Sequence, residues 1–134
     1  MATHAVTSQD FNQVVESNDL VFVDFWATWC GPCRAFGPTF EKASEANPDV
    51  YFAKVDIDQN PDLAAAAKVQ AVPTLMVVKK QQIISQQAGA LRASDLDDLI
   101  SQAKALDMDA AASDGNTASS GDAKVKTPSS QSER

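Results

Sequence analysis

Cysteine and histidine are scarce in this chain, which has two cysteines and one histidine among its 134 residues. The pair Cys30 and Cys33 cannot build a disulfide framework of the kind that holds small secreted domains together. A structural zinc site takes four Cys or His ligands, and only His4 is left to join the pair. The sequence therefore predicts neither a metal site nor a stabilising disulfide network. A hydrophobic fraction of 44% is enough to form a core without them.

A surplus of basic residues and long apolar runs are missing as well. Eleven Lys and Arg stand against 18 Asp and Glu, which argues against a nucleic-acid-binding surface. No apolar run approaches the roughly 20 residues that a membrane-spanning helix needs. The first residues show no basic segment followed by an apolar one, as a secretory signal would. We therefore expect a cytoplasmic protein that binds neither nucleic acid nor membranes.

The hydrophobic pattern predicts an α/β domain. The most apolar run, Leu20–Trp26, is apolar on both faces, as in a central strand with helices above and below. Other strands are predicted at 50–56, 74–78 and 83–88, and helices from an N-cap at Thr7 or Ser8, at 30–47, at 61–68 and from about Ser94. We expect a mixed sheet with parallel strands first, an antiparallel hairpin last and helices on both faces.

Two short segments depart from ordinary patterns. Pro38 lies inside the predicted helix 30–47, and because proline has no N–H to donate we expect a kink there, loosened by Gly37. The last hairpin has Lys80-Gln81 where tight turns favour glycine, since such turns need positive φ. A strained turn, a longer turn and another turn type all stay open.

The composition changes near residue 106. Residues 107–134 are mostly Ala, Ser, Asp, Gly, Thr and Lys, without an aromatic side chain. Such a segment buries too little apolar area to offset the entropy of ordering it. We expect a folded domain at 1–106 and a disordered tail at 107–134, a solvated appendage without a function of its own.

The segment Cys30-Gly31-Pro32-Cys33 follows the central strand. A disulfide across two residues would constrain the unfolded chain little, so thiol–disulfide exchange fits the pair better than a structural role. At a helix start Cys30 meets unpaired N–H groups and the positive end of the helix dipole, which favour the nucleophilic thiolate. Pro32 costs no hydrogen bond in the first turn. Cys33, one turn further and expected to be less exposed, is placed to attack a mixed disulfide at Cys30.

The segment Phe25–Arg34, FWATWCGPCR, resembles the active-site sequence of the thioredoxin family. Further family motifs follow in order and spacing over about residues 6–105: Asp24, Pro38, Lys54-Val55-Asp56, Asp58-Gln59-Asn60-Pro61, Val72-Pro73-Thr74 and Gly89-Ala90-Leu91. The resemblance implies a thioredoxin fold and a monomeric protein-disulfide reductase, with Cys30 attacking the substrate and Cys33 releasing it. The implied partners are protein disulfides and a thioredoxin reductase, a flavoprotein that draws on NADPH. The chain itself would bind no cofactor.

Asp24 is the most informative residue outside the cysteine pair. Alternation places it on the same face as Phe22 and Trp26, in a strand expected to be buried, where the pKa of a carboxyl group rises. A solvent-facing aspartate at a strand end is the alternative. The resemblance implies that Asp24 lies behind Cys33 and helps its proton leave and return, with Lys54 nearby. Without the resemblance, Lys54 is equally well an exposed strand lysine.

The resemblance also implies a cis Val72–Pro73 peptide bond facing Cys30, although only about 5–6% of X-Pro bonds are cis. The backbone of Val72 would then be open to pair with an extended substrate. The implied substrate surface is an apolar patch around Cys30 that consists of Trp29, Gly31, Pro32, Val72, Pro73, Ala88 and Gly89. Trp26 is expected in the core.

Two other functions stay open at this point. An oxidase or isomerase of the same fold would need export and a more strongly stabilised thiolate, whereas the Gly31-Pro32 pair resembles the reducing members. A redox-independent binding or folding module would use the fold as a docking surface and would need neither cysteine.

Overall fold

The computed structural model describes residues 2–108. The chain divides into two units, Met1–Lys104 and Ala105–Arg134, and the elements below belong to the first, apart from Ala105 at the end of the last helix. Residues 109–134, which make up nearly all of the expected disordered tail, lie outside the described residues. The domain boundary expected at residue 106 stays a prediction.

A five-stranded mixed sheet in the order β1-β3-β2-β4-β5 forms the centre of the first unit. The central strand β2 (Leu20–Trp26) pairs parallel with β3 (Tyr51–Asp56) and antiparallel with β4 (Thr74–Lys79). At the edges, β5 (Gln82–Ala88) pairs antiparallel with β4, and the short β1 (Thr3–Ala5) pairs parallel with β3. The α/β class and the mixed sheet are as predicted. Strand β1 was not predicted, because three residues are too few to show a period of two.

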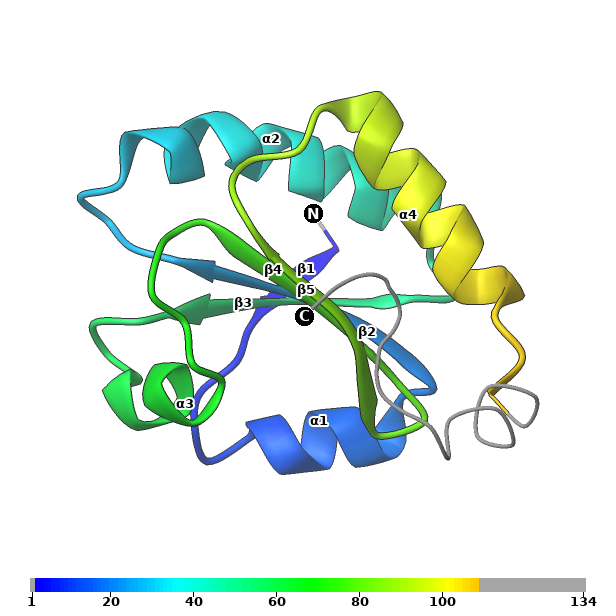
Figure 1. Cartoon of the computed structure of the whole chain (residues 1–134), viewed down its shortest axis with the longest axis horizontal. Helices are drawn as coiled ribbons and strands as arrows, with labels where there is room; N and C mark the ends of the chain where they lie inside the picture. Colours follow the sequence, from blue (N-terminus) through cyan, green and yellow to red (C-terminus); the bar gives the residue numbers. More distant parts are fainter. Residues whose placement is uncertain (1, 109–134) are drawn as a thin grey trace, which may run out of the picture. The chain divides into compact units, whose positions relative to one another are not determined.

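Within residues 2–108, four helices cover the sheet: α1 (Phe11–Ser17), α2 (Gly31–Ala46), α3 (Pro61–Ala66) and α4 (Ala93–Ala105). Figure 1 shows α2 and α4 on one face of the sheet and α1 and α3 on the other. The N-cap expected at Thr7 or Ser8 is wrong, because those residues form a turn and Asp10 is the N-cap. Helix α2 continues across Pro38.

Alternation along the central strands fills a core on each face. On the side of α2 and α4, the cluster includes Leu20, Phe22, Phe36, Phe40, Phe52, Leu75, Val77, Leu96 and Ile100. On the side of α1 and α3, it includes Val21, Val23, Phe25, Val55, Met76 and Val78, with Phe11, Val14 and Leu63 packed against it. Each fully buried side chain of this size contributes about 1.5–3 kcal/mol. Two cores therefore hold β2 in place from both sides.

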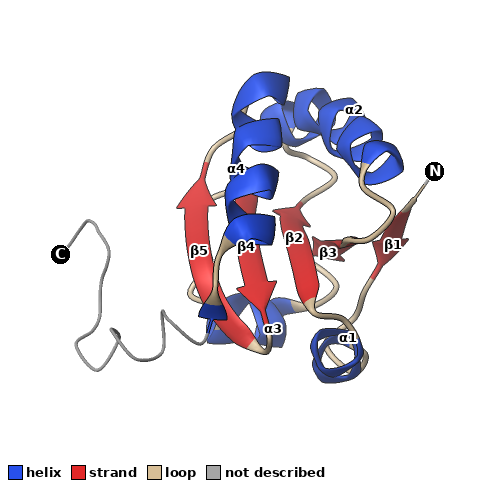
Figure 2. Ribbon diagram, turned by 90° about the vertical axis from the view of Figure 1, so that its right-hand side faces the viewer, coloured by secondary structure: helices blue, strands red, loops and turns tan. Residues whose placement is uncertain are grey.

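The hairpin between β4 and β5 is a tight turn without glycine. Lys79 pairs with Gln82, so Lys80 and Gln81 alone form the turn, and their φ angles are 48° and 67°. Figure 2 shows the two antiparallel strands side by side. Of the open alternatives, a strained two-residue turn is the one observed, since left-handed backbone is costly for residues with a Cβ.

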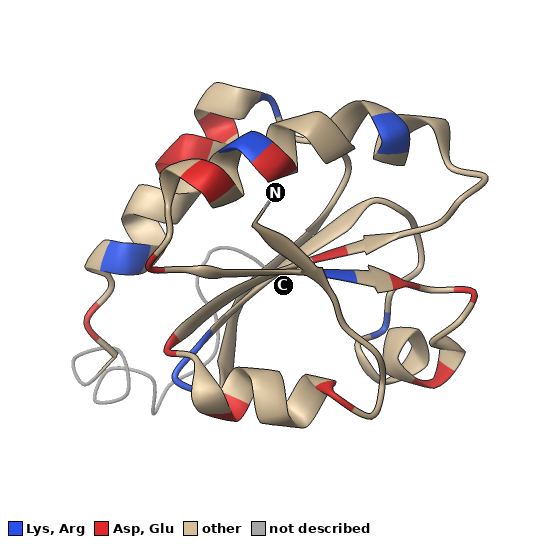
Figure 3. Ribbon diagram, turned by 180° about the vertical axis from the view of Figure 1, so that it is seen from behind, with Lys and Arg blue, Asp and Glu red and all other residues tan. Residues whose placement is uncertain are grey.

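Part of the negative charge of the chain lies on helix surfaces. Helix α4 carries Asp95, Asp97 and Asp98 against the single Lys104, and Figure 3 shows acidic residues along its turns. Solvated charges of this kind favour solubility. Asp24 is different, because it is buried within β2.

Candidate active site

The cysteine pair lies at the start of helix α2, which follows the central strand β2 in the chain. Cys30 and Cys33 are joined by a disulfide, with their Cα atoms 5.3 Å apart. Cys30 is the N-cap of α2, and its Sγ accepts a hydrogen bond from the backbone N–H of Cys33 at 3.1 Å. Pro32 stands in the first helical turn. The helix start predicted at Cys30 is confirmed, and this position favours a thiolate on its sulfur once the disulfide is reduced.

Both cysteines are buried in this disulfide-bonded form, with exposed fractions of 4% for Cys30 and 5% for Cys33. The expectation that Cys33 is the less exposed of the two is therefore wrong for this state. The reason is that both sulfurs belong to one small apolar cluster with Ala27, against which Trp26, Ile57 and Val72 pack.

Asp24 is 1% exposed, so the burial predicted from strand alternation is confirmed. Burial raises the pKa of its carboxyl group from 3.8 to about 7, and the positive charge of Lys54 opposes the rise. Within the described part of the chain, neither carboxyl oxygen has a hydrogen-bond partner. A carboxyl group in this environment can take up or release a proton near neutral pH.

Lys54 lies opposite Asp24 in the register of β2 and β3 and is half-buried, not an exposed strand lysine. Its Nζ is 5.2 Å from the centroid of the Trp26 ring, within cation–π range. Trp26, expected in the core, is only half-buried; it packs against the disulfide cluster, and Lys54 lies over its ring.

A pocket of about 500 Å³ opens beside these residues. Its lining comes from the end of β2, the first turns of α2 and β3: Trp26, Ala27, Thr28, Cys33, Arg34, Gly37 and Lys54. On its rim, Arg34 Nη1 donates to the carbonyl oxygen of Thr28 at 2.7 Å. Its lining includes Cys33 but not Cys30, and none of the residues of the expected substrate patch.

The residues of the expected substrate patch are mostly at the surface. Trp29 is 65% exposed, and Gly31, Pro32, Ala88 and Gly89 are exposed too. The Val72–Pro73 bond is cis, as the resemblance implies, and half-buried Val72 packs against the disulfide cluster. Gly89 N–H donates to the carbonyl oxygen of Pro73 at 2.8 Å, which ties the start of β4 to the end of β5.

Pro73 is the exception within the patch, because it is buried. Its expected place on the open surface is therefore wrong. The residue contributes its backbone carbonyl to the bond with Gly89 rather than an exposed ring.

Three contacts around the site were not predicted. The indole Nε1–H of Trp29 donates to Asp58 Oδ2 at 2.9 Å and fixes the exposed ring. Ile57 packs against the disulfide cluster, and Gly37 lines the pocket beside Cys33. Asp58 occurs in a motif quoted for the resemblance, but nothing in its spacing from Trp29 indicates the contact.

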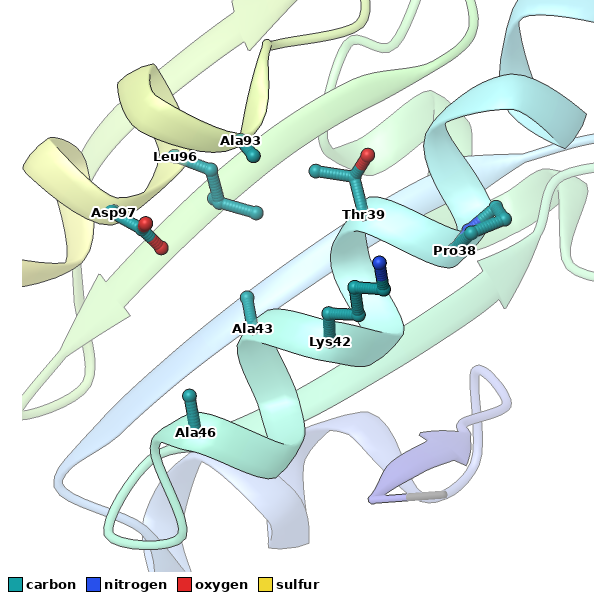
Figure 4. A pocket seen from close by; sticks show the side chains of 8 residues that line it. All are labelled: Pro38, Thr39, Lys42, Ala43, Ala46, Ala93, Leu96 and Asp97. Atoms are coloured by element: carbon teal, nitrogen blue, oxygen red, sulfur yellow. The ribbon is translucent and has the colours of Figure 1, made fainter.

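A second pocket lies between α2 and α4 and is shown in Figure 4. Its labelled side chains are Pro38, Thr39, Lys42, Ala43, Ala46, Ala93, Leu96 and Asp97. None of the predicted site residues is among them. Over the described residues, no group of three or more His, Cys, Asp or Glu could hold a metal ion. In the same part of the chain, no helix is both long and apolar enough to cross a membrane.

Comparisons with known proteins agree on one family. The Thioredoxin family model matches residues 2–102. The putative thioredoxin 2 of Streptomyces coelicolor is 50% identical over 108 residues, which cover 81% of each chain. The thioredoxin of Mycoplasma pneumoniae is 37% identical over 102 residues, or 76% of this chain and all of that one. A mutant thioredoxin from Halobacterium salinarum superposes with a TM-score of 0.74 at 34% identity, covering 78% of this chain and 93% of the other.

Proposed function

The chain belongs to the thioredoxin family and is a thiol–disulfide oxidoreductase, and on this premise we propose how its residues divide the reduction of protein disulfides. The observation that carries the proposal is the Cys30–Cys33 disulfide at the N-terminus of α2, together with the buried carboxyl group of Asp24 on β2, the strand that precedes this helix. Cys30 is the nucleophile, Cys33 the resolving thiol, and Asp24 the group that exchanges a proton with Cys33.

In the first step the Cys30 thiolate attacks one sulfur of a substrate disulfide. The substrate S–S bond breaks, and its second sulfur leaves as a thiolate that takes a proton from water. In the second step Cys33 gives its proton to Asp24 and attacks Cys30 Sγ. The bond between Cys30 and the substrate breaks, the departing sulfur takes a proton from water, and the substrate leaves as a dithiol. Two electrons have passed to the substrate, and the protein holds the Cys30–Cys33 disulfide.

Lys54 tunes the proton transfer, because its charge lowers the pKa that burial raises in Asp24. The substrate binds over the patch around Cys30, where Trp29 offers an exposed apolar ring and Val72 offers backbone groups for an extended segment. The positions of Gly31, Pro32 and Pro73 around Cys30 determine how a substrate disulfide approaches the sulfur of Cys30.

A thioredoxin reductase that carries flavin and draws on NADPH returns the protein to its dithiol form, so the protein needs no cofactor of its own. We place a monomer of this kind in the cytoplasm, where thiols are kept reduced. The alternative function is that of an oxidase or isomerase with the same fold.

The test is reduction of insulin disulfides with dithiothreitol as the electron donor. Cys30→Ser should fall to the uncatalysed rate, and Cys33→Ser should accumulate a covalent mixed disulfide that mass spectrometry detects. A Cys30→Ser, Cys33→Ser double variant that kept full cellular function would contradict the proposal and favour a binding module. A titration against glutathione that left the pair strongly oxidising would favour the rival oxidase.

A further inference from the structure

The pocket beside Cys33 has two cationic side chains in its lining, Arg34 from α2 and Lys54 from β3. Among residues 2–108, neither of them forms an ion pair with a carboxylate. Acidic residues are not scarce, because the chain has 18 Asp and Glu against 11 Lys and Arg. Two positive charges therefore share one pocket without an anionic partner from the described part of the chain.

The contacts of the two cations leave most of their N–H groups unused. Arg34 Nη1 donates to the carbonyl oxygen of Thr28 at 2.7 Å, and the rest of its five-donor fork has no acceptor among the described residues. Lys54 Nζ lies 5.2 Å from the centroid of the Trp26 ring, a contact that uses none of its three N–H donors. Asp24 is opposite Lys54 in the strand register, but neither of its carboxyl oxygens accepts a hydrogen bond from a described residue.

The pocket as a whole offers donors and few free acceptors. Its residues Trp26 and Thr28 carry an indole N–H and a hydroxyl group, which also make no hydrogen bond to a residue within 2–108. The backbone carbonyl oxygens of residues 26–28 already accept hydrogen bonds from neighbouring segments. A ligand that fits must therefore bring acceptor oxygens, and bonds to ionised groups are roughly twice as strong as those between neutral groups.

We propose that this pocket binds a small organic anion, whose carboxylate or phosphate oxygens accept hydrogen bonds from Arg34 and Lys54. Its volume of about 500 Å³ is typical of small-molecule pockets and exceeds what a bare ion fills. The body of the ligand has room beside Gly37, where an added Cβ would meet no heavy atom within 4 Å apart from its own neighbours in the chain and helix. No residue of the expected substrate patch lines the pocket, so this site is separate from the surface proposed for the disulfide substrate.

The two tryptophans provide a test within one molecule. Trp26 lines the pocket, whereas the indole N–H of Trp29 is bonded to Asp58 outside it. A proton–nitrogen NMR spectrum of the oxidised protein shows one indole signal for each, and Trp29→Phe identifies which is which. The probes are benzoate and phenyl phosphate, with benzyl alcohol as the neutral counterpart, each added at constant ionic strength.

We expect both anions to move the Trp26 signal to a limiting value and to leave the Trp29 signal in place, and benzyl alcohol to move neither. Arg34→Gln and Lys54→Met should each weaken binding about tenfold, the loss of one hydrogen bond between charged groups. Arg34 is exposed, so its variant keeps the fold if Lys54→Met does not. Lys42→Met, an exposed position on α2, changes the net charge equally and should bind as the wild-type protein does.

Tighter binding of phenyl phosphate would support the site and assign it to phosphate esters, and equal binding would support it for carboxylates as well. Four results would overturn the site: no shift with either anion, equal shifts of both indole signals, an equal response to benzyl alcohol, or equal weakening by Arg34→Gln and Lys42→Met. The measurement uses the disulfide-bonded protein without turnover. Its outcome is therefore independent of the roles proposed for Cys30, Cys33 and Asp24.

Discussion

At the scale of the residue, Asp24 links the stability of the protein to pH. The pKa of its carboxyl group is about 7 in the folded protein, against 3.8 for an ordinary aspartate. Between these two values the folded state holds a proton that the unfolded state has released. The free energy of unfolding therefore falls as the pH rises from about 4 to about 7 and stays low above that. Burial is the cause, because no hydrogen bond from a described residue supports the charged form.

We expect Asp24→Asn to remove this dependence. A shift from 3.8 to about 7 corresponds to about 4 kcal/mol, at about 1.4 kcal/mol for each pKa unit. Urea unfolding of the oxidised protein at pH 4 and pH 8 measures this change in the free energy of unfolding. The wild-type protein should lose about 4 kcal/mol more than the variant across this range. The fixed cost of a buried amide cancels in this comparison, because it is the same at both pH values.

The carboxyl groups of Asp49 and Asp62 act in the opposite direction. Hydrogen bonds from Lys104 to Asp49 and from Ser8 to Asp62 lower their pKa values, so any stability they contribute is lost as the pH falls. Both groups are present in the wild-type protein and the variant and drop out of the difference. Unfolding curves with the same pH dependence in the two proteins would show that Asp24 is solvated rather than buried.

At the scale of the element, the β4–β5 hairpin carries backbone strain. Lys80 and Gln81 both adopt positive φ, which costs residues with a Cβ roughly 1–2 kcal/mol each. Asn-Gly is the pair that this turn favours. We expect Lys80→Asn with Gln81→Gly to stabilise the protein by about 1 kcal/mol, since the larger entropy of glycine in the unfolded chain offsets part of the gain.

The midpoint of urea unfolding measures this change. The bond from Lys80 N–H to the carbonyl oxygen of Asp19, 2.8 Å, uses backbone atoms only and survives the substitution. Gln82→Gly, one residue further and inside β5, is the matched control and should lower the stability by about 0.5–1 kcal/mol. An unchanged or lower midpoint for the double variant would rule out strain in the turn.

How well the sequence predicted each element depended on its length. The run Leu20–Trp26 and the helix over 30–47 are long enough to show a period, and both were placed to within a residue. Strand β1 has three residues and is set by pairing with β3, a long-range contact that leaves no local pattern. The N-cap predicted for α1 was wrong because Thr7 and Asp10 are both residue types that suit this position. The hydrogen-bonded turn between them determines that the helix begins after Asp10.

At the scale of the whole molecule, the site combines residues that are predictable for different reasons. The burial of Asp24 follows from the alternation of β2, and the position of Cys30 from helix-start chemistry. The cis bond before Pro73 follows from the family resemblance alone, since the residues by themselves favour trans. The hydrogen bond from Trp29 to Asp58 joins segments 29 residues apart, and no spacing rule predicts it.

The two cores of the first unit share their strands, and this predicts a single cooperative transition. Phe40 on α2 is fully buried between the rings of Phe36 and Phe52, and Met76 of β4 is 2% exposed on the opposite face. Because β2, β3 and β4 send alternate side chains into both cores, losing either core leaves the strands uncovered. We expect Phe40→Ala to cost about 3–5 kcal/mol and Met76→Ala about 2–5 kcal/mol.

In both variants the lower stability should appear as a single unfolding transition of the whole sheet. One face of the sheet should not unfold separately from the other. Tryptophan fluorescence and far-UV circular dichroism report on different parts of the structure, and their urea curves should coincide with unchanged slopes. Lys42→Ala, an exposed change on α2, should stay within about 0.5 kcal/mol of the wild-type protein. A variant in which fluorescence changes before circular dichroism would mean that one face unfolds alone, and that the active site does not share the stability of the sheet.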